Sequence, residues 1–406
     1  MTSTWTTLRP LLPTVFLPSA VFGIGQGAGS PVIALTARDL GASVGVAGVI
    51  VALVGLGAVL GDLPAGRVVA RFGERRSIIA GSMIGTVGVL LSLLAWTPVV
   101  LALGALLTGV SNAVWGLARQ SYLAEVVPVP MRARAMATFA LMWRLGFLIG
   151  PFAGALVILG IGTRGGFAVQ LAGVVISGYL MSRVPDPSRA HDAPVGGVSL
   201  GTILRRHRRL LVTLGAGSML MGAARAAREA ALPLWADHIG LDAASASMVF
   251  GIGAAFDLLC SYPAGQLMDR YGRRFIAVPS LLIIALSYFL LPISHNVWTI
   301  GAVAVIMGIG NGFGNGVIMT LGADIAPAAT RAQFLAAWRL THDFGMFLGP
   351  LAAGVAATVV ALGLAVVGLG MVSTTGAAVM YRYIPRFVPA PARGVADAVP
   401  VRTSTH

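Results

Sequence analysis

The stretch Pro263–Arg274, PAGQLMDRYGRR, decides the fold because an earlier stretch, Pro64–Arg76, repeats it as PAGRVVARFGERR. The two copies lie 199 residues apart. The same offset joins further pairs, which are Gly109 and Gly308, Asn112 and Asn311, Pro128 and Pro327, Arg132 and Arg331, and Gly150-Pro151 and Gly349-Pro350. A register that holds over roughly 90 residues indicates a chain built from two related halves.

The composition excludes an ordinary soluble protein. Of 406 residues, 57% are hydrophobic and 10% are charged, whereas soluble domains carry roughly 25% charged residues. The single cysteine, Cys260, excludes an internal disulfide and a cysteine-built metal site. The first apolar run begins near Leu11 and continues for a full membrane span, so we interpret it as a retained helix and not as a cleaved signal peptide.

Apolar runs of membrane-spanning length occur twelve times along the chain. A helix needs about 20 such residues to cross the hydrocarbon core. The predicted spans are 12–36, 45–65, 77–97, 99–124, 134–160, 165–183, 210–236, 244–265, 275–294, 297–323, 331–357 and 360–382. The even number places both termini on the same side of the membrane.

Arginine distribution predicts which side that is. All 28 basic residues are arginines, against 14 acids, which gives a net charge of +14. By our span boundaries, 21 arginines lie in the termini, in the loops or at the span ends on one side, and only Arg38 and Arg164 lie on the other. The positive-inside rule therefore places both termini in the cytoplasm. The net charge is mainly a topology signal, and we expect no nucleic-acid partner, because the short loops carry no aromatic stacking platform.

The polar segment 185–209 divides the chain into two halves of six spans. We predict an N-terminal six-helix bundle over 1–184, a cytoplasmic linker over 185–209, a C-terminal six-helix bundle over 210–384, and a disordered cytoplasmic tail over 385–406. Parallel repeats of this kind are a transporter design, with the substrate site between the halves near the bilayer midplane.

The segment Gly265–Arg274 resembles the cytoplasmic signature of the major facilitator superfamily, and the resemblance extends over essentially the whole chain. It implies an all-α membrane fold of two pseudo-symmetric six-helix bundles. The first copy departs from the pattern at Ala70, where aspartate is usual, and at Glu74. In that family the loop latches the two halves together. The gate candidates are therefore Gly66, Arg71, Gly73, Arg75, Gly265, Asp269, Arg270, Gly272 and Arg273. The alternative is a plain positively charged topology anchor.

The fifth span is similar to a motif of the drug and metabolite:proton antiporters of that superfamily. Its residues are Gly146, Gly150, Pro151 and Gly154, and glycines at this spacing form a smooth ridge on one helix face. The alternative is ordinary close helix packing. Exporters of this group usually carry an arginine in the fourth span, where this chain has Ala105.

Charged residues inside spans are functional candidates because burying a charge in the bilayer is costly. We select Asp257, Glu229, Asp343 and His342 as proton-coupling candidates. The substrate-cavity candidates are Gln26, Asn112, Trp115, Arg119, Arg144, Arg225, Arg228, Asn311, Asn315 and Arg339.

Several pairings within this set follow from the register and the spacing. The offset of 199 aligns Arg144 with Asp343, which suggests an ion pair between the halves. The structural alternatives are pairing of Arg119 with Glu125, neutralisation of Arg225 or Arg228 by Glu229, and a hydrogen-bonded packing role for His342.

These features favour a secondary transporter that exports a drug-like or metabolite molecule from a bacterial cell across the cytoplasmic membrane, driven by a proton gradient. Five embedded arginines against three carboxylates favour instead, as an alternative, import or facilitated passage of a small organic anion. A non-transporting sensor or partner-binding membrane protein is a remote alternative. We expect a monomer among membrane lipids with a small-molecule substrate, without enzyme activity, metal or cofactor.

Overall fold

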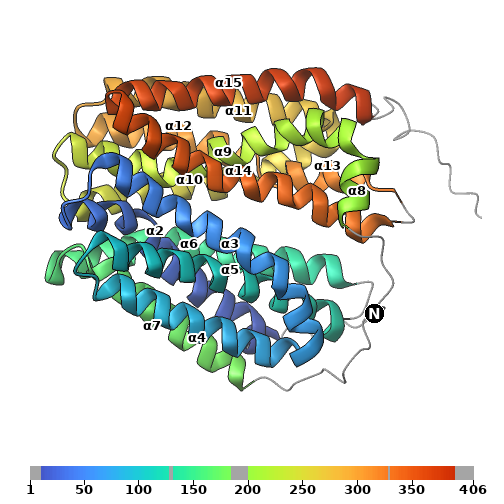
Figure 1. The fold of residues 1–406 in the computed structure, drawn as a ribbon, viewed down its shortest axis with the longest axis horizontal. Coiled ribbons are helices and arrows are strands. Elements are labelled where there is room, and N and C mark those ends of the chain that lie inside the picture. The colour runs from blue at the N-terminus through green and yellow to red at the C-terminus, as the bar shows by residue number, and fades with distance from the viewer. Residues whose placement is uncertain (1–10, 128–130, 184–199, 328–329, 389–406) are drawn as a thin grey trace, which may run out of the picture.

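A computed structural model describes residues 11–127, 131–183, 200–327 and 330–388, and this part of the chain is helical with short turns (Figure 1). The first bundle contains α2 (Leu17–Asp39), α3 (Val44–Phe72), α4 (Glu74–Leu93), α5 (Pro98–Val126), α6 (Arg132–Ile161) and α7 (Gly165–Ser182). The second contains α9 (Arg208–His238), α10 (Ala243–Tyr271), α11 (Arg273–Leu290), α12 (Val297–Phe313), α13 (Val317–Ile325), α14 (Arg331–Val359) and α15 (Leu362–Phe387). A short helix, α8 (Leu200–Arg206), precedes the second bundle.

The predicted spans correspond to these helices, with one correction: span 297–323 is divided into α12 and α13. Eleven spans are long and apolar enough to cross a membrane. The remaining one, α14, is not among them, and it carries the polar residues Arg339, His342 and Asp343. Residues 185–199 of the predicted linker, residues 389–406 of the predicted tail, and Pro128 lie outside the described residues.

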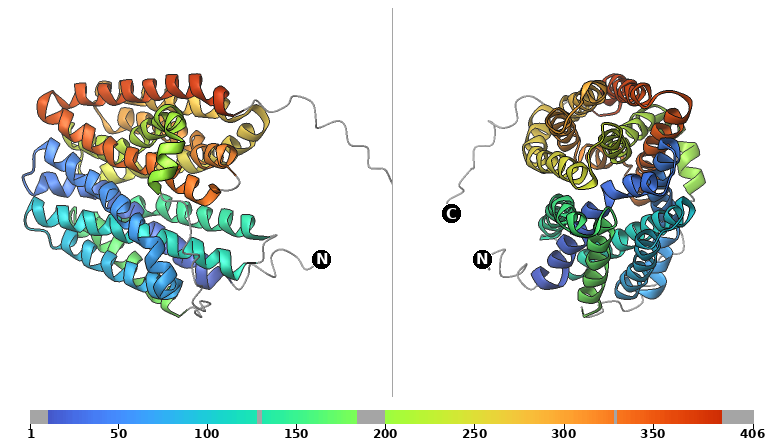
Figure 2. Two further views of the ribbon diagram at one scale, coloured as in Figure 1. Left: turned by 45° about the vertical axis from the view of Figure 1, so that its right-hand side comes forward. Right: turned by 90° about the vertical axis from the view of Figure 1, so that its left-hand side faces the viewer.

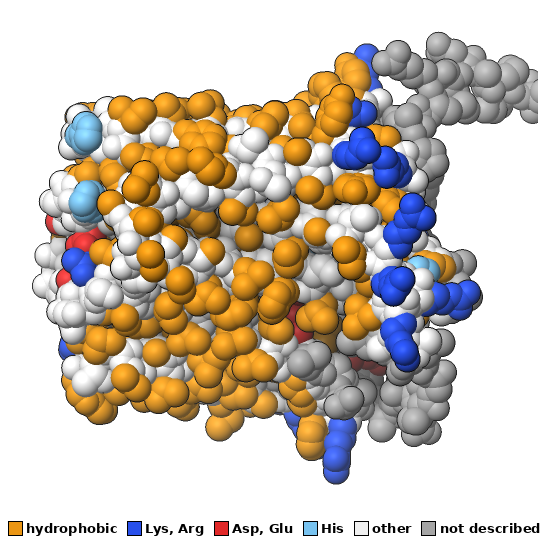
Figure 3. Space-filling view, turned by 45° about the horizontal axis from the view of Figure 1, so that its top comes forward, with side chains coloured by type: hydrophobic (Ala, Val, Ile, Leu, Met, Phe, Trp, Pro, Cys, Tyr) orange, Lys and Arg blue, Asp and Glu red, His pale blue; other side chains and the backbone are white. Residues whose placement is uncertain are grey.

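The two bundles lie side by side, and the first helix begins and the last helix ends at the same end of the molecule (Figure 2). We call this the terminal end. The bundles meet where α14 packs on α3 and where α10 packs on α6. Hydrophobic side chains cover the middle of the outer surface, and arginines gather toward one end (Figure 3). This distribution fits a surface that faces lipid in the middle and water at the ends.

Side-chain caps start four of the helices at the end opposite the termini. Ser43, Thr97, Asp242 and Asn296 each accept a hydrogen bond from a backbone N–H in the first turn of α3, α5, α10 and α12. Such caps satisfy donors that a helix start leaves unpaired. The hydrogen bonds from Ser245 also lower the pKa of Asp242 below its usual value.

The glycine motif of α6 packs within the first bundle. A Cβ added at Gly146 would lie 2.0 Å from the Ala20 carbonyl oxygen of α2, and one added at Gly150 would lie 2.3 Å from that of Ile24. The equivalent Gly349 of α14 approaches Ala223 of α9 in the same way, at 2.1 Å. Glycine in this motif therefore allows the backbones of two helices to touch, and it does so in both bundles.

Replacing Gly150 by alanine is expected to lower the thermal stability of the protein. The new Cβ would overlap a backbone carbonyl that cannot rotate away, and overpacking of this kind costs about 1–3 kcal/mol. Gly160, near the end of the same helix, is a matched control because an added Cβ meets nothing within 4 Å there. Thermal unfolding in detergent should show a lower midpoint for Gly150→Ala and an equal or higher one for Gly160→Ala. Equal midpoints for both variants would contradict this packing role.

Candidate functional site

The centre of the site is a break between α12 and α13. Five of the six residues in Asn311–Gly316, NGFGNG, are glycine or asparagine, which form turns readily, and Gly316 has a φ of +82°, a conformation that favours glycine. At the break, the Gly314 carbonyl accepts a hydrogen bond from Arg225 Nη1 at 3.3 Å in addition to one from the Val317 backbone N–H at 3.4 Å. Discontinuous helices line substrate sites in other transporter folds. We missed this break in the sequence, although the glycine run was its signal.

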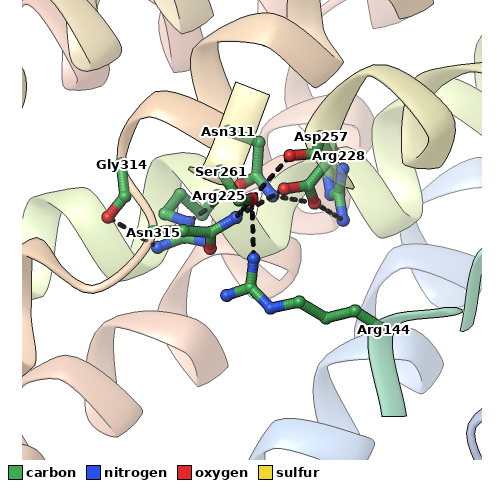
Figure 4. A network of polar contacts seen from close by, with 8 residues as sticks. All are labelled: Arg144, Arg225, Arg228, Asp257, Ser261, Asn311, Gly314 and Asn315. Carbon is green, nitrogen blue, oxygen red and sulfur yellow. Dashed lines mark hydrogen bonds and ion pairs between the residues drawn. The ribbon is translucent and has the colours of Figure 1, made fainter. Parts of the chain in front are cut away.

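Asp257 of α10 lies at the middle of a polar group that we call the central cluster (Figure 4). Its carboxylate accepts hydrogen bonds from Asn311 Nδ2 and Asn315 Nδ2, each at 2.6 Å. Arg228 Nη2 of α9 lies 3.5 Å from Asp257 Oδ2. The other members of the central cluster are Arg144, Arg225 and Ser261.

Two further arginines complete the central cluster. Arg225 Nε donates to Asn311 Oδ1 at 2.8 Å, and its Nη2 donates to Asn315 Oδ1. Arg144 comes from α6 of the first bundle and donates through Nη1 to the Ser261 hydroxyl at 2.7 Å. Figure 4 shows Arg144 reaching toward the group from below, whereas Arg225 and Arg228 lie to its left and right. The central cluster therefore joins the two bundles.

The central cluster carries an excess of positive charge. Three guanidinium groups and the Asp257 carboxylate give the cluster a formal charge of +2 (three minus one), and Glu229 beside Arg228 reduces the local excess to +1 (three minus two). The side chains of Arg228 and Asp257 are only 12% and 16% exposed. Charges within a membrane protein are expensive unless they are paired or solvated. This arrangement can therefore accommodate an added anionic group.

The first bundle presents a neutral counterpart of this site. Asn112 Nδ2 donates to Gln26 Oε1 at 3.1 Å, and these residues lie 199 positions before Asn311 and Arg225. Among the described residues, Asn112 Oδ1 is buried without a hydrogen-bond partner. The first bundle thus supplies amides where the second supplies an arginine and an amide.

The predicted ion pair between Arg144 and Asp343 is wrong. Asp343 accepts a hydrogen bond from Arg339 Nε at 3.1 Å, on its own helix, while Arg144 is bound to Ser261. The two positions are equivalent in the repeat but do not meet, because α6 packs on α10 and α14 packs on α3.

Asp62 of α3 is a partner that the sequence analysis missed. Its Oδ2 lies 3.8 Å from Arg339 Nη2, and its carboxyl lies within hydrogen-bonding reach of Asp343. We call Asp62 and Asp343 the carboxyl pair. These two acids come from different bundles and share one arginine, Arg339. An acid inside the apolar run 45–65 was the signal that could have revealed it.

Glu229 faces the first bundle. The Ser30 hydroxyl of α2 lies within hydrogen-bonding reach of its carboxyl, and Arg228 is its nearest opposite charge. Farther along the same helices, Arg38 Nε lies 3.0 Å from Asp237 Oδ2. This pair links the two bundles at the end opposite the termini.

Three candidates lie within single bundles. Trp115 stacks on Phe22 and donates to Ser82 Oγ at 2.9 Å. Arg119 is fully buried, lies over the Trp115 ring and donates to the Val15 carbonyl and the Ser19 hydroxyl, so it does not pair with Glu125. His342 contacts the Ser218 carbonyl through Nδ1 at 3.3 Å. The structure places none of these three among the central cluster or the carboxyl pair.

The two copies of the gate motif form the turns between α3 and α4 and between α10 and α11. Gly73 and Gly272 have φ values of +81° and +89°, which favour glycine. An added Cβ at Gly66 or at Gly265 would meet nothing within 4 Å. In each copy, the second glycine (Gly73 or Gly272) is needed for the turn. The first glycine (Gly66 or Gly265) has open space beside it.

The charged residues of the motif contact their own bundle. Arg273 Nε lies 2.8 Å from Asp324 Oδ2 of α13, and its Nη1 lies 3.8 Å from Asp269. Arg75 donates to the Ser182 carbonyl of α7. Arg71 and Arg270 lie over the rings of their neighbours Phe72 and Tyr271. A latch between the halves stays a prediction.

Comparison with known proteins agrees with this architecture. The sequence pattern of the Major Facilitator Superfamily matches residues 15–256 and again residues 214–403. The uncharacterized MFS-type transporter YfkF of Bacillus subtilis is 24% identical over 352 residues, which cover 82% of this chain and 85% of that protein. The multidrug resistance protein MdtG of Salmonella paratyphi A is 31% identical over 160 residues, 37% of this chain and 38% of that protein.

A crystal structure of the nucleoside transporter NupG has the same fold. It superposes with a TM-score of 0.75 at 15% identity, covering 93% of this chain and 99% of that one. The repeated motif, the two six-helix bundles and a family match over nearly the whole chain lead to one conclusion. The protein belongs to the Major Facilitator Superfamily, and it is a multi-pass membrane transporter and not an enzyme.

Proposed function

We propose that this transporter carries a small organic anion or zwitterion, and that the central cluster binds its anionic group. The observation that supports the proposal is the approach of Arg144, Arg225 and Arg228 to a single carboxylate, Asp257, at the junction of the bundles. Guanidinium groups bind carboxylate and phosphate through paired hydrogen bonds. An anion held between Arg144 and Arg225 would contact both bundles, as alternating access around a central site requires.

Asp257 acts in this proposal as a built-in counter-ion. Two amide donors and one guanidinium already surround its carboxylate. The substrate anion would take over part of the arginine charge that Asp257 compensates in its absence. We therefore assign Asp257 to substrate binding in preference to proton transfer.

The carboxyl pair is our proposed site of proton coupling. Asp62 and Asp343 lie close together and share only Arg339, so the two acids and one base hold one unpaired negative charge. Two carboxyl groups within hydrogen-bonding reach of each other can share one proton, which belongs to the pair as a unit. Glu229, next to Ser30 and Arg228, is the second acid that can take this role.

We infer export in antiport with protons, across the cytoplasmic membrane of a bacterium, with both termini in the cytoplasm. The partial similarity to a multidrug resistance protein supports export. Import of the anion is the alternative. It is favoured by Ala105, which is buried where exporters of this group carry an arginine.

Replacing Arg225 by glutamine is expected to lower transport of the anion at least about 30-fold in kcat/KM. In the proposal, Arg225 and the substrate anion form a buried charge pair, and removing one partner of such a pair costs about 2–5 kcal/mol. Radiolabelled organic acids and their uncharged amides would be assayed as probes in inverted membrane vesicles, and the acid alone should accumulate. Arg209→Gln, at an exposed position of α9, is the matched control and should transport normally. Equal transport of acid and amide would exclude anion recognition.

Neutralising the carboxyl pair should separate substrate movement from proton movement. We expect Asp62→Asn and Asp343→Asn to abolish accumulation driven by a pH gradient while retaining exchange of labelled for unlabelled substrate. Asp257→Asn should impair both, because Asp257 belongs to the binding site. If Asp62→Asn, Asp343→Asn and Glu229→Gln all keep gradient-driven accumulation, the proposed coupling is refuted.

The proposed orientation can be measured by cysteine labelling of intact cells. In a Cys260→Ala background, an impermeant maleimide should label His295→Cys, which lies exposed before α12. It should label Arg206→Cys of α8 only after the cells are opened. The reverse pattern would place the termini outside.

A further inference from the structure

A groove on the outer surface of the second bundle lies between α11 and α15. It has a volume of about 570 Å³. Its apolar walls include Val278 and Leu282 of α11 and Ala378 of α15. Leu282 is 46% exposed. Since α15 packs on α9 and α11 at the edge of the bundle, the groove opens away from the first bundle and toward lipid.

Arginines line the groove at its terminal end. The Arg274 guanidinium lies 3.5 Å above the centre of the Tyr381 ring, and Arg382 lines the groove beside it. Among the described residues, neither arginine forms an ion pair, and no acid lines the groove. Tyr381 is 57% exposed, so its ring holds the Arg274 guanidinium at the surface of the bundle.

A third arginine increases the positive charge at this end. Arg386 follows Arg382 by four residues on α15, and its guanidinium lies over the Tyr383 ring at 5.2 Å. Like charges at this spacing destabilise a helix. A bound anion would relieve the repulsion between Arg382 and Arg386.

We propose that this groove binds an anionic phospholipid. The lipid phosphate would lie between Arg274 and Arg382, and an acyl chain would follow Val278, Leu282 and Ala378 toward the middle of the bilayer. Leu282 lies eight residues from Arg274, which corresponds to about 12 Å along a helix and matches the first part of an acyl chain. Basic pockets between helices on the cytoplasmic side bind anionic headgroups in other membrane proteins. The site is separate from the central cluster. The proposed orientation of the chain determines only the leaflet in which the bound lipid lies.

Native mass spectrometry of the full-length protein in detergent would test this site, with palmitoyl-oleoyl phosphatidylglycerol and phosphatidylcholine as probes. We expect the first phosphatidylglycerol to bind the wild type at least about tenfold more tightly than phosphatidylcholine. The double variant Arg274→Gln/Arg382→Gln should lose this preference. Arg205→Gln/Arg206→Gln, which removes two exposed arginines of α8, is the matched control and should keep it.

Three outcomes would overturn the proposal. Equal affinity of both lipids for the wild type would show that the groove does not select an anionic headgroup. Equal loss in the control variant would show attraction to general surface charge. Displacement of the lipid by an equal concentration of glycerol phosphate would show a phosphate site that does not use the apolar walls. Thermal unfolding of each variant would establish that the lost binding does not arise from misfolding.

Discussion

The burial of Asp257 among three arginines is the interaction on which the arrangement of the site depends. A carboxylate in the middle of a membrane bundle needs donors. It obtains them from Asn311 in the last turn of α12 and from Asn315 in the break between α12 and α13. The same two amides present their oxygens to Arg225. Each asparagine thus connects the acid to a base. At the break, the Gly314 carbonyl also accepts a hydrogen bond from Arg225, beside the one from the Val317 backbone N–H.

The repeat determines which residues can meet across the two bundles. At an interface with twofold symmetry, only residues on the axis face their own equivalents, and all others exchange partners. Ser30 with Glu229 and Arg38 with Asp237 are equivalent positions that face each other, so α2 and α9 pass close to the axis. Arg144 with Ser261 and Asp343 with Asp62 are exchanged partners away from it. The two halves have diverged, so one exchanged contact contains the basic Arg144 and the other contains the two acids Asp62 and Asp343.

The sequence predicted the helices and the two bundles because hydrophobic run length and an internal repeat are properties of the chain itself. It also placed Arg225 and Arg228 on one helix face, since helical spacing is local. Contacts between halves were harder to predict. The offset aligned Arg144 with Asp343 correctly as equivalents, but a sequence register does not give the distance of a residue from the symmetry axis. Asp62 was overlooked for a related reason, because an isolated acid near a span end resembles an interfacial residue until its partner on α14 is known.

The two ends of the molecule hold the bundles together with contacts of different chemistry. Arg38 and Asp237 form a simple pair in which both side chains are 34% exposed, and an exposed pair of this kind contributes only about 0–1 kcal/mol. The carboxyl pair at the terminal half has two acids for one base, so its strength changes with the number of protons that it holds. Under the proposed mechanism, binding of a proton therefore changes the strength of the carboxyl-pair contact and leaves the contact between Arg38 and Asp237 unchanged. Under that mechanism, a pH gradient would bias which end opens, because both contacts take part in the same rocking motion of the bundles.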